Sequence, residues 1–298
     1  MAIDEFTAVL RAREFMRKVN PTTIPVAVEK YAEEAKAMIR PQADLEPDEA
    51  GYSFQSNGRY FICTNSNNSP ERQRFTVCHE LAHIKLKLPS QHEALPWWSY
   101  AKRPLAEILC DVIAAELLLP YDLFKPEVEK SDVSLAGVDD LADRFQASFT
   151  ATGSRFAAVV STPLAFVLSE QGKIRYASRS SPLKDAGAWI APRLDLPDVS
   201  FSKKVRAGAL SDRPEHVDAD IWFSDWERGG TLLEEVRHVA QWDQTLTLLW
   251  FEDEQIPPRM VRNDRGELAE QEEDLEGDDG LLKELDGYLR WPGKHRRR

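Results

Sequence analysis

The feature that most constrains this chain is the run His79-Glu80-Leu81-Ala82-His83, which places two histidines four residues apart. In an α-helix that spacing puts both imidazoles on one face, where they can reach a single metal ion. Glu80 lies one position round the helix, so its carboxylate can act as a general base without binding the ion itself. The pattern favours a metal site on a helix. The alternative is an amphipathic helix with two unconnected histidines.

A catalytic zinc ion needs a third protein ligand from a later element. Glu107 supplies one, 24 residues after His83, in an apolar segment at 105–119 that Pro120 ends. Asp111 follows on the same helical face, where it can accept a hydrogen bond from a ligating imidazole and fix its tautomer. Two acids among Ile, Leu, Val and Ala are costly to bury unless a cation compensates them. The alternative is that both acids lie on the solvent face of this helix.

The wider pattern resembles a known family. Residues 70–83 read PERQRFTVCHELAH, and they are followed by EILCD at 107–111 and AAELLLP at 114–120. Together these segments resemble the ImmA/IrrE family of zinc metallopeptidases. The similarity is tight from about residue 60 to residue 120, weaker to about residue 160 and loose beyond. Ala82 departs from the glycine that many relatives carry, which is a small change.

The resemblance implies one Zn²⁺ per chain, or another divalent ion, bound by His79, His83 and Glu107. It also implies that Glu80 activates water and that Asp111 supports a ligand. The function implied is a zinc-dependent endopeptidase that cuts a regulatory protein, namely a helix-turn-helix transcriptional repressor, in response to stress or another signal. The alternative is a non-catalytic metal-containing sensor or transcription-related binding module. Glu80 favours the peptidase, because a structural metal site has no use for a base beside its ligands.

Two segments near the expected site carry open alternatives. The strand expected at 58–64 precedes the metal helix, where it either pairs with an extended substrate by β-augmentation or forms part of the core. In the tryptophan-rich loop that follows the metal helix, Tyr100 and His92 are candidates for stabilising an oxyanion. A loop aromatic more often serves packing.

The segment at 138–160 predicts a short helix, a turn near 146–148 and a second helix, in the order of a helix-turn-helix. From position 141 onward its basic residues are Arg144 and Arg155, with Asp143 nearby, which is a poor set for contacting phosphates. We therefore expect a packing or substrate-docking helix pair and not direct DNA binding.

Composition supports a globular protein without a membrane span. Of the 298 residues, 42% are hydrophobic and 30% charged, and no apolar run approaches the roughly 20 residues that cross a bilayer. The first residues are acidic and lack an export signal, so we expect a cytoplasmic protein. The cysteines Cys63, Cys78 and Cys110 form no CxxC pair, which argues against a disulfide framework. Next to the expected site, Cys78 and Cys110 are expected to be small buried side chains, with a redox switch as the alternative.

Further elements follow from periodicity and breakers. Further helices are expected at 5–20, 26–39 and 231–240. Strands are expected at 164–168 and 173–177, joined as a hairpin, and at 245–251. Between residues 264 and 286 there are eleven acids and two bases, which account for most of the net charge of −12. We expect that stretch to be a disordered tail.

Together these patterns predict an α+β protein. A mainly helical, zincin-like metallopeptidase domain with a small sheet is expected at 1–125, followed by the helix-turn-helix-like segment at 126–162. A smaller α+β domain that senses a signal or binds a partner is expected at 163–262, and the acidic tail at 263–298.

Overall fold

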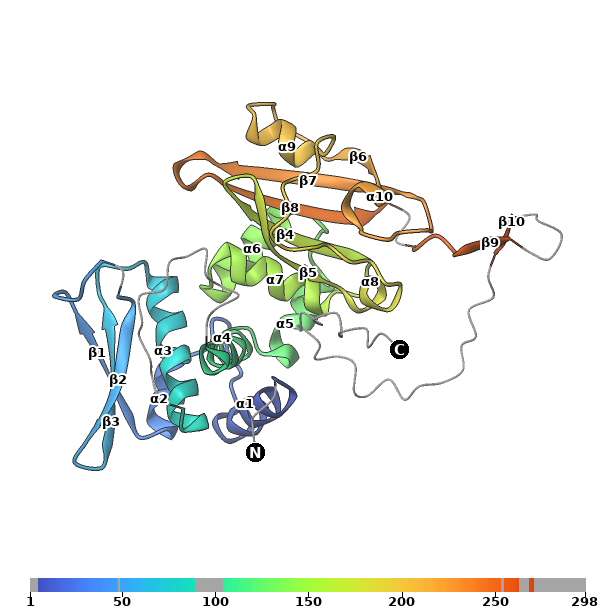
Figure 1. Ribbon diagram of the computed structural model, residues 1–298. Helices are drawn as coiled ribbons and strands as arrows, with labels where there is room; N and C mark the ends of the chain where they lie inside the picture. The colour runs from blue at the N-terminus through green and yellow to red at the C-terminus, as the bar shows by residue number, and fades with distance from the viewer. Residues whose placement is uncertain (1–4, 48, 89–103, 253–254, 263–267, 271–298) are drawn as a thin grey trace, which may run out of the picture.

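A three-stranded sheet and a five-stranded sheet occupy opposite ends of the molecule, with helices between them (Figure 1). The computed structural model describes residues 5–47, 49–88, 104–252, 255–262 and 268–270. The helices are α1 (Glu5–Val19), α2 (Val28–Glu34), α3 (Pro70–Leu86), α4 (Leu105–Leu118), α5 (Tyr121–Val128), α6 (Leu135–Phe145), α7 (Phe149–Val159), α8 (Ser181–Asp185), α9 (Phe201–Arg206) and α10 (Ala219–Trp222). The strands are β1 (Ala37–Gln42), β2 (Gly51–Ser56), β3 (Arg59–Asn65), β4 (Leu164–Glu170), β5 (Lys173–Arg179), β6 (Glu215–Asp218), β7 (Thr231–Val239), β8 (Gln244–Phe251), β9 (Met260–Arg262) and β10 (Leu268–Glu270).

Helix α3 has well-defined caps at both ends. The Ser69 side chain accepts a hydrogen bond from the Arg72 backbone N–H, and Pro70 occupies the first turn, where its missing N–H costs nothing. Lys87 adopts a left-handed conformation at the other end and stops the helix. Most of the middle of α3 is buried, so the histidine motif lies inside the protein.

The three-stranded sheet has the order β1-β3-β2, in which β3 pairs in parallel with β1 and antiparallel with β2. The strand expected at 58–64 is therefore the central one, and both of its edges are occupied. The expectation that it could pair with a substrate is wrong, and the core alternative is confirmed. Strand β2 is an edge strand of this sheet and packs against α3. No strand was expected at its position.

The helix expected at 26–39 is wrong in its second half. Helix α2 ends at Glu34, Lys36 takes a left-handed backbone conformation, and the chain continues as β1. Pro41, which cannot continue a helix, lies within β1. A proline is tolerated there because β1 is an edge strand of its sheet and needs no backbone donor on its open side.

The helix expected at 231–240 is also wrong, since this segment forms strand β7. Leu232, Glu234 and Val236 alternate as its buried positions. Glu234 is a charged residue at an interior position, so it hides the alternation of apolar and polar residues that marks a strand. Pairing with β8 and β6 overrides the helical propensity of the segment.

The five-stranded sheet has the order β5-β4-β8-β7-β6 with antiparallel neighbours throughout. The expected hairpin of β4 with β5 and the expected strand at 245–251 are confirmed. Along β4, Phe166 faces the helices and Val167 faces a second core on the other side of the sheet. Burial on both faces explains why β4 begins with five apolar residues in a row, at 164–168.

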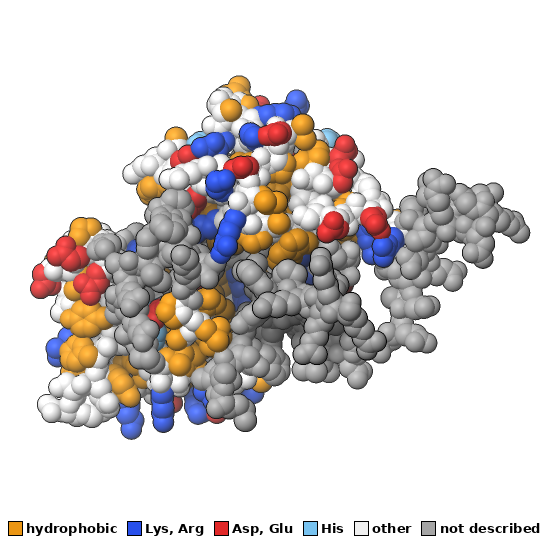
Figure 2. All heavy atoms as spheres, in the orientation of Figure 1, with side chains coloured by type: hydrophobic (Ala, Val, Ile, Leu, Met, Phe, Trp, Pro, Cys, Tyr) orange, Lys and Arg blue, Asp and Glu red, His pale blue; other side chains and the backbone are white. Residues whose placement is uncertain are grey.

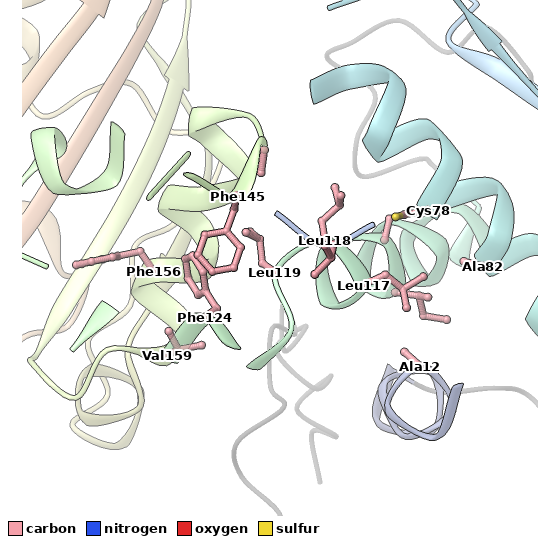
Figure 3. Close-up of a cluster of buried hydrophobic side chains, with 14 of the residues drawn as sticks. Ala12, Cys78, Ala82, Leu117, Leu118, Leu119, Phe124, Phe145, Phe156 and Val159 are labelled. Atoms are coloured by element: carbon pink, nitrogen blue, oxygen red, sulfur yellow. The ribbon is translucent and has the colours of Figure 1, made fainter. Parts of the chain in front are cut away.

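One hydrophobic core joins the helical half of the chain to the five-stranded sheet. It runs from α1 and α3 through α4 to α6 and α7, and it includes Phe166 on β4 and Leu248 on β8 (Figure 3). Helix α7 lies inside this core, and Ala158 is its one exposed residue. The expected helix pair is present, with Gln146 in a left-handed conformation between α6 and α7.

Some hydrophobic side chains remain at the surface. Figure 2 shows hydrophobic side chains over the three-stranded sheet, where Met38 and Phe54 are exposed, and also over the half with the five-stranded sheet. No helix in the described ranges is long and apolar enough to cross a membrane. Most of the expected acidic tail lies outside the described residues, except that Leu268–Glu270 pairs as β10 with β9.

Enlarging Gly153 should destabilise the protein, because a Cβ atom there would lie 2.5 Å from the Phe166 ring. Gly153→Ala gains helix propensity, but overpacking against this ring should cost more and lower the free energy of unfolding by about 1–3 kcal/mol. Urea denaturation measures the change, with Ala158→Leu as a control on the exposed side of the same helix. A more stable Gly153→Ala variant would contradict the packing described here.

Candidate metal site

The candidate site lies between α3 and α4, which pack side by side. His79 and His83 project from α3, and their Nε2 atoms are 3.1 Å apart. Glu107 on α4 reaches both rings, with one carboxylate oxygen 3.1 Å from His79 Nε2 and the other 3.4 Å from His83 Nε2. The structure therefore brings together the three residues that the sequence predicted as ligands.

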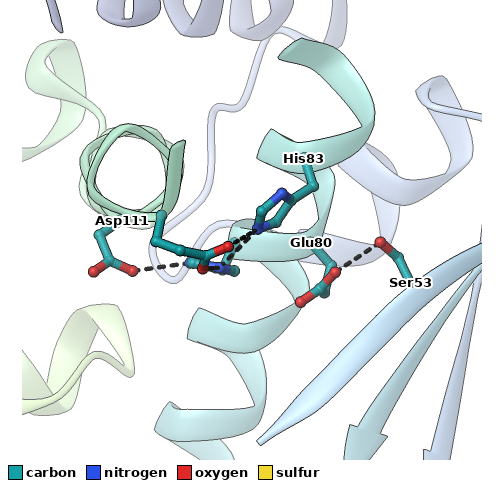
Figure 4. A network of polar contacts seen from close by, with 6 residues as sticks. Ser53, Glu80, His83 and Asp111 are labelled. Carbon is teal, nitrogen blue, oxygen red and sulfur yellow. Dashed lines mark hydrogen bonds and ion pairs between the residues drawn. The ribbon is translucent and has the colours of Figure 1, made fainter. Parts of the chain in front are cut away.

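Asp111 contacts His79 from the side opposite to Glu107. Its Oδ1 lies 2.9 Å from His79 Nδ1. An ionised carboxylate can only accept a hydrogen bond, so Nδ1 is the donor and the ring is oriented with Nε2 toward Glu107. Figure 4 shows Asp111 projecting from α4 and His83 from α3 toward the same space. The placement predicted for Asp111 is the one observed.

Burial makes the charges of this cluster depend on each other. His79, Glu80, His83 and Glu107 are 9%, 1%, 2% and 7% exposed. Burial alone would lower the pKa of His79, but hydrogen bonds with Asp111 and Glu107 outweigh it and raise that pKa to about 9. Burial alone would raise the pKa of Glu107, yet its hydrogen bonds with His79 and His83 hold it well below its ordinary value. The cluster stabilises a positive charge between the two helices.

The spacing of these atoms fits a divalent cation. Ligands at zinc–ligand distances of about 2.0–2.1 Å in a tetrahedron lie roughly 3.3 Å from one another. The two imidazole Nε2 atoms are 3.1 Å apart, one Glu107 oxygen lies 3.1 Å from His79 Nε2, and the other Glu107 oxygen lies 3.4 Å from His83 Nε2. Two nitrogens and one carboxylate are also a donor set that zinc accepts in catalytic sites. His79, Glu80 and His83 moreover form a group compact enough to hold a metal ion.

Glu80 is held by a residue that the sequence did not indicate. Ser53 on β2 donates a hydrogen bond of 2.7 Å to Glu80 Oε2 (Figure 4). The sequence did contain a pattern that could have singled out Ser53. Tyr52, Ser53 and Phe54 alternate, and in a strand this alternation turns the serine to the opposite face from the two aromatic rings. A carboxylate fixed by a neutral donor stays available to accept a proton.

The other residues singled out from the sequence are two candidates for oxyanion stabilisation and the cysteines. Tyr100 and His92, the candidates for oxyanion stabilisation, lie outside the described residues. Cys63, Cys78 and Cys110 are buried and form no disulfide within the described part of the chain, and Cys78 belongs to the hydrophobic core. Burial raises the pKa of Cys78 to about 12.

Comparison with known proteins agrees with this geometry. Residues 32–157 match the family described as the IrrE N-terminal-like domain, a range that contains α3, α4 and every residue of the cluster. This match agrees with the resemblance of the motif residues to the ImmA/IrrE family. An ImmA/IrrE relative, the radiation response metalloprotease IrrE of Deinococcus radiodurans, is 26% identical over 162 residues, which cover 53% of this chain. The match spans 48% of that relative, about half of its length.

A solved structure extends the similarity of fold beyond the ImmA/IrrE region. A transcriptional regulator of Mycobacterium tuberculosis superposes with a TM-score of 0.53 and 14% identity, over 83% of this chain and 88% of that one. At this identity the similarity concerns the fold alone. It covers most of this chain, so the arrangement of the helical half with the five-stranded sheet has a counterpart among solved proteins.

Cys78 should resist alkylation in the folded protein. Because its pKa is raised to about 12, the reactive thiolate is nearly absent at pH 8, and burial blocks the reagent. We expect iodoacetamide at pH 8 to modify Cys78 at least about 100-fold more slowly in native protein than in urea-unfolded protein. Peptide mass spectrometry reads the modification, and equal rates in the two states would contradict the described burial.

Proposed function

We propose that this chain is a zinc-dependent endopeptidase. The observation that carries the proposal is the convergence of His79 and His83 of α3 with Glu107 of α4, whose two carboxylate oxygens lie 3.1 and 3.4 Å from the two Nε2 atoms. Glu80 follows His79 on α3. The name of the Deinococcus relative, a metalloprotease, supports the same activity. A non-catalytic metal site would not need Glu80, whose carboxylate is buried at the cost of desolvation.

The side chains of the chain divide the work of peptide hydrolysis. A bound zinc ion supplies Lewis acidity, which acidifies water and polarises a carbonyl oxygen. Glu80 takes a proton from the attacking water and passes it to the leaving amine. Ser53 fixes the orientation of the Glu80 carboxylate, and Asp111 fixes the tautomer and orientation of His79. Burial of the cluster keeps these contacts in a medium where they are strong.

The proposed substrate is a regulatory protein, namely a helix-turn-helix repressor, as the family resemblance implies. A protease holds an extended segment most simply by adding it to a sheet edge. Among the described strands, β2 is the edge strand whose residue Ser53 contacts Glu80, so a substrate strand paired with β2 would pass next to the proposed base. This edge replaces β3 in the role considered from the sequence.

Direct reading of DNA by the helix pair is not part of the proposal. A recognition helix must present a solvent-facing side to the major groove. Helix α7 packs on β4 and β5 and is exposed at Ala158. Its arginine, Arg155, is ion-paired with Glu116 inside the protein. These contacts support a structural role for the pair.

Zinc content tests the proposed ligands. The purified protein should hold about one zinc ion, and His79→Ala, His83→Ala and Glu107→Ala should each lose it, because two protein ligands cannot retain the ion against dilution. Elemental analysis after gel filtration measures the stoichiometry. His216→Ala is the matched control, since His216 is an exposed histidine paired with Glu252. Full zinc content in Glu107→Ala would show that the third ligand is another group.

Activity tests the proposed base. Glu80→Gln preserves size and cannot accept a proton, so it should bind zinc normally and cleave a repressor encoded beside its gene about 10²- to 10⁴-fold more slowly. Discrete cleavage is followed by mass spectrometry. Ser53→Ala retains the carboxylate and loses its hydrogen bond, and it should keep more activity than Glu80→Gln. Wild-type turnover by Glu80→Gln would favour the non-catalytic metal-containing sensor.

A further inference from the structure

A second buried carboxylate lies on α4, away from the metal site. Glu116 is 2% exposed and accepts a hydrogen bond of 3.2 Å from Arg13 Nε on α1. Arg155 on α7 forms an ion pair with the other oxygen of the same carboxylate. Arg155 Nε also donates to the Leu119 carbonyl, 3.2 Å away, just after the end of α4.

The position of Glu116 along α4 places it opposite to the metal site. Glu116 comes nine positions after Glu107, and nine positions correspond to two and a half turns of an α-helix. The two residues therefore lie on opposite sides of α4. Between the two faces the helix is apolar. Its buried apolar residues are Leu109, Cys110, Ile113, Ala114, Leu117 and Leu118. Packing of such side chains is non-directional, so the polar contacts at the two faces select the rotation of α4 about its own axis.

Arg155 is itself held in place by the helix that carries it. On α7, Ser154 Oγ lies 3.1 Å from the hydroxyl of Tyr176 on β5. Gly153 on the same helix lies against the Phe166 ring of β4 so closely that a Cβ atom would not fit. The sheet therefore fixes α7, and α7 presents Arg155 to α4 from a constant position.

We propose that Arg155 is a positioning residue for the metal site. By holding Glu116 and the Leu119 carbonyl it fixes the rotation of α4, and through α4 it sets the placement of Glu107 and Asp111. The inference rests on the proposed function, since it requires that these residues serve a metal ion. The competing explanation is that Arg155 only neutralises a buried charge, which would affect stability and leave the metal site unchanged.

Full-length variants separate the two explanations. Arg155→Met keeps much of the apolar stem and removes both hydrogen bonds, whereas Arg155→Lys keeps the charge. The double variant Arg155→Met with Glu116→Met replaces the buried ion pair by apolar groups, which is often neutral or stabilising in protein interiors. Arg144→Met is the matched control, because Arg144 pairs with Glu127 and Asp140 outside α4.

Three measurements are made on each variant: thermal unfolding, zinc affinity by competition with a chromophoric chelator, and the visible absorption spectrum of the Co²⁺-loaded protein. We expect Arg155→Met and the double variant to bind zinc about tenfold more weakly and to show an altered Co²⁺ spectrum. Arg155→Lys should lie closer to wild type in zinc affinity and Co²⁺ spectrum, and Arg144→Met should match the wild-type protein in both. The double variant should bind zinc more weakly although its melting temperature stays near that of wild type.

Wild-type zinc affinity and Co²⁺ spectrum in both Arg155→Met and the double variant would overturn the positioning role, whatever their melting temperatures. Failure of the wild-type protein to bind either metal would instead overturn the proposed function. The two failures are thus distinguished by which protein shows them.

Discussion

The rest of the structure depends on the contact between the imidazoles of α3 and the carboxylates of α4. Glu107 is buried with His79 and His83, and Asp111 holds the outer nitrogen of His79. Neither helix could bury these groups alone, because an isolated charge in an apolar interior is far too costly. The other elements hold the two helices in this mutual position. The three-stranded sheet supports α3, and α1 and α7 bind the opposite face of α4.

The five-stranded sheet enters the same arrangement through the helix pair. On β7, Glu235 accepts a hydrogen bond from the Leu135 backbone at the start of α6, and Arg237 forms a bidentate ion pair with Asp139 on the same helix. The Arg237 guanidinium also lies over the ring of Phe149 at the start of α7. The sheet is thus joined to the helical half by directed polar contacts as well as by a shared core, and α7 lies between the two.

Sequence reasoning succeeded where the deciding signals are local. Ser69 and Pro70 mark the start of α3, and the spacing of the histidines fixes their common face once a helix is present. It failed where distant partners decide. Pro41 lies in a strand because β3 runs beside it, and Ser53 reaches Glu80 from β2, a strand that no local pattern predicted. Such contacts depend on tertiary pairing, which overrides propensity.

A buried acidic residue indicates that a hydrogen-bond donor or a cation compensates its charge, but the sequence does not show which kind. Glu234 on β7 receives backbone N–H groups at the start of α9 and the indole N–H of Trp222, and these contacts satisfy the carboxylate with neutral donors. Glu116 receives guanidinium groups, which bring their own fixed positive charge. Glu107 alone of these three faces two imidazole nitrogens, which can release their protons and offer lone pairs instead. Because of that difference in donor chemistry we propose the Glu107 cluster as the metal site and assign the other two carboxylates a structural role.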